Sequence, residues 1–294
     1  MLFPALPPRP ISSTPLSSIP PSPVLAGRIT TIIHDRHSNP SPSDPLRGGD
    51  VLLSQHPFRS PGHPEAHIPI LPASGLTSEI PTKYVQCSIS GRDPTLIALF
   101  VTGILGRIAR GHHTSIVGFD IDTKSHYTPA TTITAIPTGI KILNRFRSIR
   151  PPRIYSITPI YPIAGSPFSS SFGGVTGIIR ANSTIDTLLH DTHSVVGHFH
   201  HASPPGAVYT FFAAFHNHIP YFTSYNEFYG RLHSRTFPIS PNPIFLPMHQ
   251  SGANGFPRRT SDYPVTYLRY QRVGALGILG IFIPFGFFLR STLS

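Results

Sequence analysis

The chain has 294 residues, a net charge of +11 and a pI near 10.2, yet charged residues make up only 12% of it, about half the usual share in a soluble domain. The single cysteine, Cys87, excludes an internal disulfide framework and a cysteine-rich zinc module. Basic residues are scattered singly, so the positive charge does not predict a nucleic-acid partner.

The N-terminal part, residues 1–50, is a Pro/Ser-rich segment that ends in a predicted loop, "DPLRGGD" at residues 44–50. Prolines interrupt the apolar start of the first 26 residues, so no signal peptide is expected there. The 35 prolines and 24 glycines are typical of low-complexity chains. However, the hydrophobic share of 39%, with 20 phenylalanines, is too high for a solvated tail.

Apolar stretches follow near residues 94–106, 127–147, 172–181, 195–221 and 274–289. None provides the unbroken apolar run of about 18 to 20 residues that a simple membrane span needs, and residues 94–106 and 274–288 come nearest. Short strands and broken helices both fit these stretches, because periodicity does not decide between them. Hydropathy by itself is therefore only a weak indication of a membrane protein.

Histidine pairs are the most distinctive polar feature. In "GHPEAH", His63 and His67 are one helical turn apart, so they would share a helix face on either side of Glu65. This spacing fits a metal site or a catalytic base. The adjacent His112 and His113 could reach one ion only from the same side.

Two later pairs have different geometries. On a helix, His198 and His200 would point to nearly opposite faces, which suits one helix that contacts two different centres. His190 and Asp191 form a loop-like pair that could hold a hard cation. With 17 histidines in the chain, chance clusters are the competing explanation. If metals do bind, imidazole-rich ligation favours copper, iron or zinc over magnesium.

Seven motifs follow one another along the chain in this order: "GGDVLLSQH", "GHPEAHIPILP", "GHHTSIVGFDIDT", "AIPTGIKI", "GGVTGIIRANSTIDTLLHDT", "VVGHFH" and "GFPRRTSDYP". They closely resemble the subunit I family of mitochondrial cytochrome c oxidase, from about residue 2 to the end of the chain. The resemblance implies an all-α, polytopic transmembrane bundle with about eight of the family's roughly twelve spans. Residues 1–294 would form a partial subunit I domain that lacks the N-terminal spans.

The resemblance also implies a function and a location. The family reduces dioxygen to water with electrons from cytochrome c and pumps protons. It lies in the mitochondrial inner membrane, surrounded by the lipid bilayer and by the oxidase subunits II and III, without a nucleic-acid partner. Its cofactors are a low-spin heme a, a high-spin heme a3, the copper called copper B, and magnesium.

The resemblance also implies a role for each of the following residues. His63, His112 and His113 match the copper ligands. His198 matches the axial ligand of heme a3, and His200 matches one axial ligand of heme a, whose other ligand lies outside this sequence. Glu65, Thr138 and Lys141 match residues of proton paths, His190 and Asp191 match magnesium ligands, and Arg258 and Arg259 match residues that hold heme propionates.

His67 departs from the family, which has a catalytic tyrosine at this position. Other departures have the same direction, since each can arise from a single T-to-C change in a codon. They are Arg59, Arg110, Arg145 and Arg235 at tryptophan positions, His126, His193, His201 and His216 at tyrosine positions, Ser60, Ser74, Ser115 and Ser234 at phenylalanine positions, Pro57 and Pro69 at leucine positions, Ala66, Ala109 and Ala202 at valine positions, and Thr114 at a methionine position.

This direction supports the hypothesis that the sequence is the translation of a gene whose messenger is corrected by C-to-U editing. The literal chain should insert poorly into a membrane, because an arginine near a span centre costs about 2.5–3.5 kcal/mol and an interior helix proline about 3 kcal/mol. Arg107 and Asn144 stand at phenylalanine and serine positions and need other changes. Two alternatives therefore stay open: the product of a decaying pseudogene, and a basic, proline-rich binding protein without metals.

Overall fold

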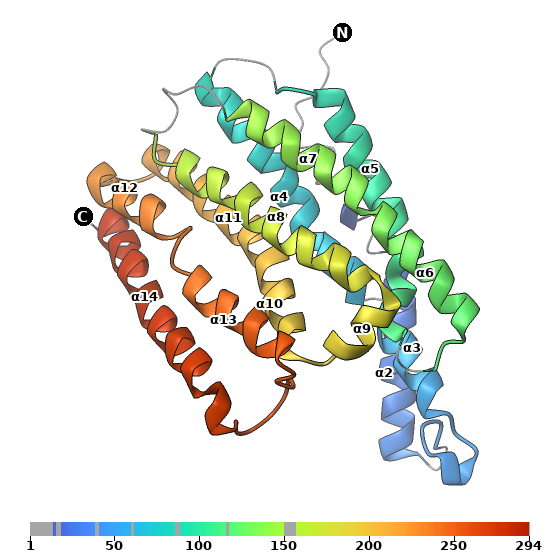
Figure 1. Ribbon diagram of the computed structural model, residues 1–294. Coiled ribbons are helices and arrows are strands. Elements are labelled where there is room, and N and C mark those ends of the chain that lie inside the picture. The colour runs from blue at the N-terminus through green and yellow to red at the C-terminus, as the bar shows by residue number, and fades with distance from the viewer. Residues whose placement is uncertain are drawn as a thin grey trace.

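The computed structural model describes residues 14–15, 19–38, 41–59, 62–85, 89–115, 118–149 and 157–293. Within these ranges the chain is helical and forms no strand; an isolated antiparallel bridge joins Thr192 to Pro257. The expected all-α class is thus confirmed. Figure 1 shows the helices side by side in one bundle, with α2 and α3 extending from its lower end.

The described chain contains the following helices in order. They are α2 (Pro21–His37), α3 (Val51–Arg59), α4 (Gly62–Val85), α5 (Arg92–Ala109), α6 (Ile121–Ile133), α7 (Ala135–Ser148), α8 (Ile160–Ala181), α9 (Ser183–Leu189), α10 (His193–Ala202), α11 (Pro204–His218), α12 (Glu227–Thr236), α13 (Asn242–Ala253) and α14 (Leu268–Thr292). Short 3₁₀ turns lie at Pro45–Arg47, Arg110–Thr114, Ile219–Tyr221 and Val265–Tyr267. The turn at Pro45–Arg47 lies in the loop predicted at residues 44–50, while α2 occupies much of the Pro/Ser-rich segment.

The sequence predicted helices interrupted by proline, and two of the long apolar stretches are indeed divided. Residues 195–221 divide at Ser203, because Pro204 and Pro205 occupy the first positions of α11, where their missing N–H groups cost nothing. Residues 127–147 divide at Thr134, between α6 and α7. By contrast, α4 continues through Pro69, Pro72 and Pro81 without a break.

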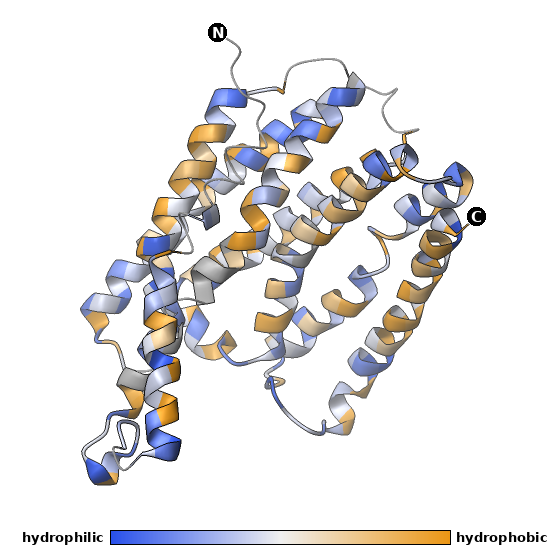
Figure 2. Ribbon diagram, turned by 180° about the vertical axis from the view of Figure 1, so that it is seen from behind, coloured by the Kyte–Doolittle hydropathy of each residue, from blue (hydrophilic) through white to orange (hydrophobic). Residues whose placement is uncertain are grey.

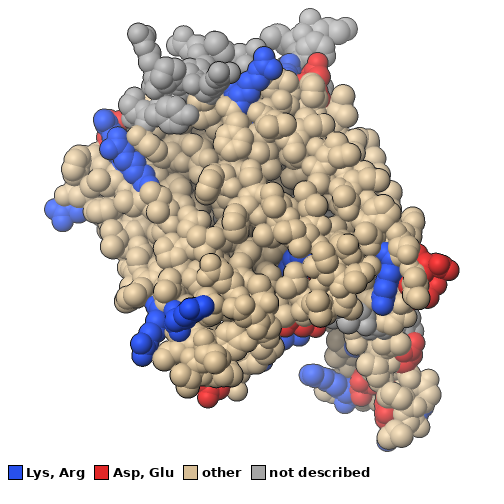
Figure 3. All heavy atoms as spheres, in the orientation of Figure 1, with Lys and Arg blue, Asp and Glu red and all other residues tan. Residues whose placement is uncertain are grey.

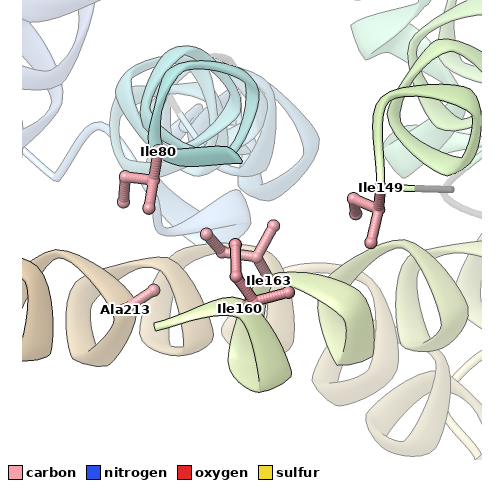
Figure 4. Packing of buried hydrophobic residues seen from close by; sticks show 5 residues of the cluster. All are labelled: Ile80, Ile149, Ile160, Ile163 and Ala213. Atoms are coloured by element: carbon pink, nitrogen blue, oxygen red, sulfur yellow. The ribbon is translucent and has the colours of Figure 1, made fainter. Parts of the chain in front are cut away.

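An apolar cluster joins four helices at one end of the bundle. Ile80 of α4, Ile160 and Ile163 of α8 and Ala213 of α11 meet there with Ile149, the residue that follows α7 (Figure 4). Each of these side chains is at most 4% exposed. This cluster fixes the positions of α4, α8 and α11, and α8 in turn packs against α10.

The outer surface is more apolar than a water-facing surface. On α5, Ile97 and Phe100 are 64% and 70% exposed, and on α14, Leu276 and Phe282 are 68% and 64% exposed. Figure 2 shows from behind that α14 is mostly hydrophobic, and Figure 3 shows charged side chains near the borders of one face with few between them. A large exposed apolar surface is typical of contact with a membrane or a partner.

Two stretches of the described chain are long and apolar enough to cross a membrane, Arg92–Thr114 and Val265–Thr292. They contain residues 94–106 and 274–288, which the sequence indicated as the nearest approach to a span. Exposed rather than buried apolar faces distinguish both helices from the core helices of a soluble protein.

Candidate functional site

Helix α10 lies between α8 and α13 and presents a histidine to each neighbour. His198 contacts α8, whereas the His200 ring stacks on Phe245 of α13 with ring centroids 5.0 Å apart. The predicted opposite-face arrangement is therefore present. It follows from helix geometry, since residues two apart differ by about 200° around the axis.

The His198 ring is held by its Nδ1 atom. Nδ1–H donates to the Gly173 carbonyl at 3.0 Å, and the Thr176 hydroxyl lies 3.0 Å from the same nitrogen. Gly177 lies against Cε1 of the ring. A hydrogen bond at one imidazole nitrogen fixes the tautomer and leaves the other nitrogen to bind a metal, so Nε2 of His198 is suited to be an axial ligand.

His200 has the same type of arrangement. Its Nδ1–H donates to the Val196 carbonyl at 2.8 Å, one turn back along α10, which leaves Nε2 on the side of α13. In each of the two histidines, the Nδ1 hydrogen bond therefore fixes the ring orientation, and Nε2 points away from the backbone carbonyl that Nδ1 contacts.

The sequence reasoning missed His249 of α13, which lies beside this pair. Its ring is 5.0 Å from that of His201 and lies so close to Gly197 that a methyl group there would collide with it. Both ring nitrogens of His249 and Nε2 of His201 are buried without a hydrogen-bond partner in the described part of the chain. A lone histidine in "LPMHQ" carries no spacing signal, so only packing could reveal it.

His112 and His113 lie on the 3₁₀ turn after α5, with ring centroids 4.1 Å apart and ring planes at 48°. The Thr131 hydroxyl of α6 lies 3.2 Å from His112 Nδ1. Two adjacent imidazoles suit copper or zinc.

A polar cluster lies where α8, α9 and the loop after α13 meet. Asp186 accepts hydrogen bonds on both oxygens, from Arg180 at 3.4 Å and from His190 Nδ1 at 3.1 Å. His190 Nε2 is 3.9 Å from Asp191, and Asp191 is 3.7 Å from Arg258. His190 and Asp191 thus belong to one network of acidic and basic side chains.

The protonation state of Asp186 follows from these contacts. Burial acts to raise its pKa, but the hydrogen bond from His190 and the positive charge of Arg180 outweigh burial, and the pKa of Asp186 is lowered from its ordinary value. Asp186 is therefore a carboxylate at neutral pH and fixes the orientation of the His190 ring.

Other predicted residues are less closely grouped. Arg258 joins the cluster and donates its backbone N–H to the Asp191 carbonyl at 2.9 Å, while Arg259 is exposed, with φ of 63°. Thr138 and Lys141 lie on α7, about one helical turn apart, and Lys141 is 5% exposed. The backbone of His63, Glu65 and His67 is helical in α4, but their side chains lie outside the described part of the chain.

The predicted cofactors can be tested against the donor atoms present. Among the described side chains, no group of three or more His, Cys, Asp or Glu is arranged to hold a metal ion. His112 with His113 and His190 with Asp191 are pairs that fit part of such a set. For heme, two oriented imidazoles adjoin buried polar atoms without partners on His249, His201 and Arg180. Imidazole nitrogens and a guanidinium are the kinds of group that bind heme iron and heme propionates.

The described chain is an all-helical bundle in which α10 presents one histidine to α8 and another to α13. The family "Cytochrome C and Quinol oxidase polypeptide I" matches residues 20–283. The chain belongs to this family of membrane proteins, whose members carry heme and copper. The resemblance read from the seven motifs is thereby confirmed.

Similar proteins include cytochrome c oxidase subunit 1 of Pecten maximus, 36% identical over 91% of this chain and 57% of the relative. The same subunit of Cereibacter sphaeroides is 36% identical over 91% of this chain and 48% of its own, and that of Candida albicans 35% over 87% and 48%. The chain thus spans about half the length of the curated relatives it matches. A heme-copper terminal oxidase dimer has the same fold, with a TM-score of 0.73, 20% identity and coverage of 96% of this chain and 55% of that one.

Proposed function

We propose that residues 1–294 form part of the catalytic subunit of cytochrome c oxidase, which reduces dioxygen to water with electrons from cytochrome c and couples this reaction to proton pumping. The observation that carries the proposal is the pair His198 and His200, which α10 presents to two different neighbours beside buried polar atoms without partners. Membership of the oxidase family supports it.

The residues of this chain would bind and orient the cofactors. His198 Nε2 would bind the iron of heme a3, with the ring held by Gly173, and His200 would provide one axial ligand of heme a. When bound, the hemes and copper B supply the electron transfer and oxygen chemistry.

The remaining ligands lie on other elements. His112 and His113, on the turn after α5, would hold copper B together with His63 of α4. At the polar end of the bundle, His190 and Asp191 would hold magnesium, and Arg258 and Arg259 would hold heme propionates through charge-assisted hydrogen bonds.

Proton uptake would use polar residues within the bundle. Thr138 and Lys141 of α7 form one candidate path and Glu65 of α4 another. A buried lysine on a membrane helix is costly unless it has a function, which supports this role for Lys141. His67 stands where the family has its catalytic tyrosine, so a chain translated without editing lacks the tyrosine that would donate a proton and an electron.

The proposal includes C-to-U editing of the messenger, which would replace the residues that depart from the family by the family's own residues. Several of them are buried: Ser74, Ala109, Thr114, Ser115, Arg145, His201, His216 and Ser234 are each at most 8% exposed. Arg145, His201 and Ser234 also have buried polar atoms without partners in the described part of the chain. Larger apolar or aromatic side chains at these sites would remove such atoms and fill the core better, as editing would do.

The location and partners follow from the same proposal. The chain would be a multi-pass protein of the mitochondrial inner membrane, in contact with lipid through the exposed faces of α5 and α14 and with subunits II and III elsewhere. It would not bind nucleic acid.

Difference spectra of the full chain, reconstituted with heme in detergent, test the proposal. We expect carbon monoxide signals from hemes at both His198 and His200, because this sequence would provide one axial histidine for each. His198→Ala and His200→Ala should each remove part of the signal and the double variant should remove all of it, whereas the exposed control His126→Ala should retain it. Absence of any heme spectrum would contradict the proposal and favour the binding protein without metals.

A further inference from the structure

Arg180 is an unusual residue within the candidate site. It lies in the last turn of α8, two turns from Gly173 and one turn from Thr176, the residues that hold His198. Its side chain is only 12% exposed. A basic residue in the last turn of a helix is favourable for the helix dipole, but an exposed position would serve that purpose equally well.

The ion pair that Arg180 makes is incomplete. A single contact, from Nη2 to Asp186 Oδ1, has a length of 3.4 Å, while Nε and Nη1 are buried without a hydrogen-bond partner in the described part of the chain. Asp186 cannot satisfy the remaining donors, because its other oxygen accepts from His190. A buried guanidinium with unused donors is costly unless an acceptor reaches it.

The surroundings of Arg180 indicate which acceptor this is. Arg180 lies on the same face of α8 as Gly173 and Thr176, which contact His198, because residues four and seven apart share a helix face. Its partner Asp186 also contacts His190, which lies beside Asp191 and Arg258. The guanidinium is therefore on the α8 face that contacts His198, next to the polar cluster that includes Arg258. An anionic group of the cofactor bound at His198 would meet it at this place.

We propose that Arg180 is a cofactor-positioning residue that donates from Nε or Nη1 to a propionate carboxylate of the heme bound at His198. Asp186 holds the guanidinium from the other side and keeps it directed toward the heme. This inference rests on the proposed function, since it requires a heme at His198.

The test compares hemin, whose two propionates are free, with hemin dimethyl ester, which has no carboxylate. The full chain in detergent micelles is titrated with each compound and the dissociation constants are read from the Soret band. The variants are Arg180→Leu and Arg180→Gln, and the matched control is Arg272→Leu, which removes an exposed arginine of α14. Circular dichroism verifies the helix content of each variant.

We expect both Arg180 variants to weaken hemin binding by about tenfold and to leave binding of the ester unchanged, because one charge-assisted hydrogen bond is lost. Arg272→Leu should change neither constant. Equal effects of the Arg180 variants on hemin and on the ester, or no effect on either, would overturn the inference while the heme site stands. Failure of the unmodified chain to bind both compounds would instead contradict the proposed function.

Discussion

Asp186 shows how a single carboxylate organises the polar end of the site. It joins Arg180 of α8 to His190, the residue that precedes Asp191, and its side chain is 11% exposed. Since its pKa in the folded protein is lowered by His190 and Arg180 against the effect of burial, the charged form contributes to stability. That contribution is present above the unfolded pKa of about 4 and is lost as the pH falls through the lower folded value.

Asp186→Asn is accordingly expected to lower the free energy of unfolding at neutral pH by about 1–3 kcal/mol, because Arg180 and His190 lose a charged acceptor. The variant should also lose stability less steeply than the unmodified chain below pH 4. Thermal unfolding in detergent between pH 3 and pH 7 measures both effects. The exposed control Asp262→Asn should retain the steep dependence, and an identical pH profile for Asp186→Asn would refute the prediction.

Arg145 is a second residue whose surroundings do not match its chemistry. It is 8% exposed, it donates from Nη2 to the Ser74 carbonyl at 3.3 Å, and its Nε is buried without a partner in the described part of the chain. Lys141, another buried cation, lies one turn away on α7. Arg145 and Ser74 both stand at positions where editing would restore an aromatic residue.

Replacing Arg145 by tryptophan should therefore raise the free energy of unfolding by about 1–3 kcal/mol, because a buried unpaired donor is removed. The double variant with Ser74→Phe should gain more than the two single variants together if the two aromatic side chains pack on each other. Arg147→Trp, at an exposed position of α7, is the control and should have little effect. A loss of stability in Arg145→Trp would count against editing at this codon.

At the scale of the helices, close contact between α8 and α10 is what brings Gly173 to His198. A Cβ atom built on Gly173 would lie 2.8 Å from the backbone N and Cα atoms of Ala202. The backbone of Ala202 cannot move without moving α10, so the absence of a side chain at Gly173 permits this approach. Gly174, the next residue, has no neighbouring atom within 4 Å of such a Cβ.

The two glycines should respond with opposite signs. Gly173→Ala is expected to lower the free energy of unfolding by about 1–3 kcal/mol through overpacking against α10. Gly174→Ala should raise it by up to about 1 kcal/mol, because alanine favours the helix and meets open space. Denaturant unfolding followed by circular dichroism measures both. Similar values for the two variants would show that the contact between α8 and α10 is looser than described.

At the scale of the whole molecule, many polar residues lie inside the bundle and many large apolar residues lie outside. Thr77, Thr95 and Thr210 are 1% exposed and donate to backbone carbonyls, whereas Phe100 and Leu276 are about 70% exposed. This distribution suits a protein surrounded by lipid, where exposed apolar side chains have no cost and buried polar groups pair with the backbone. The interior also contains buried polar side chains that do not suit this environment, and they stand at positions that the proposed editing would change: Arg145, His201 and Ser234.

The messenger should therefore differ from the gene at defined codons. We expect the complementary DNA to encode leucine at positions 57 and 69, tryptophan at 59 and tyrosine at 67, and sequencing of the transcript across codons 57 to 74 measures this directly. A read extended to codon 107 should find this codon unchanged, because its arginine does not arise from a single T-to-C change in a phenylalanine codon. A transcript identical to the gene, or none at all, would favour the pseudogene and leave the catalytic tyrosine absent.

The sequence by itself determined which residues can act and on which side of a helix they lie. The spacing of His198 and His200 predicted two opposite centres because the helical repeat is local and needs only neighbouring residues. The ordered motifs likewise identified the family. Short stretches did not predict helix continuity: proline divides the chain at Ser203 but not within α4.

Only the tertiary structure decided which distant residues meet. His249 lies against Gly197, and the Arg258 backbone N–H donates to the Asp191 carbonyl, although these partners are about 50 and 70 residues apart. No local pattern encodes such contacts, because they depend on how α8, α10 and α13 pack and on the glycines that permit close approach. The residue types of the site were thus readable from the sequence, while its boundaries, and the unused donors of Arg180, followed from packing.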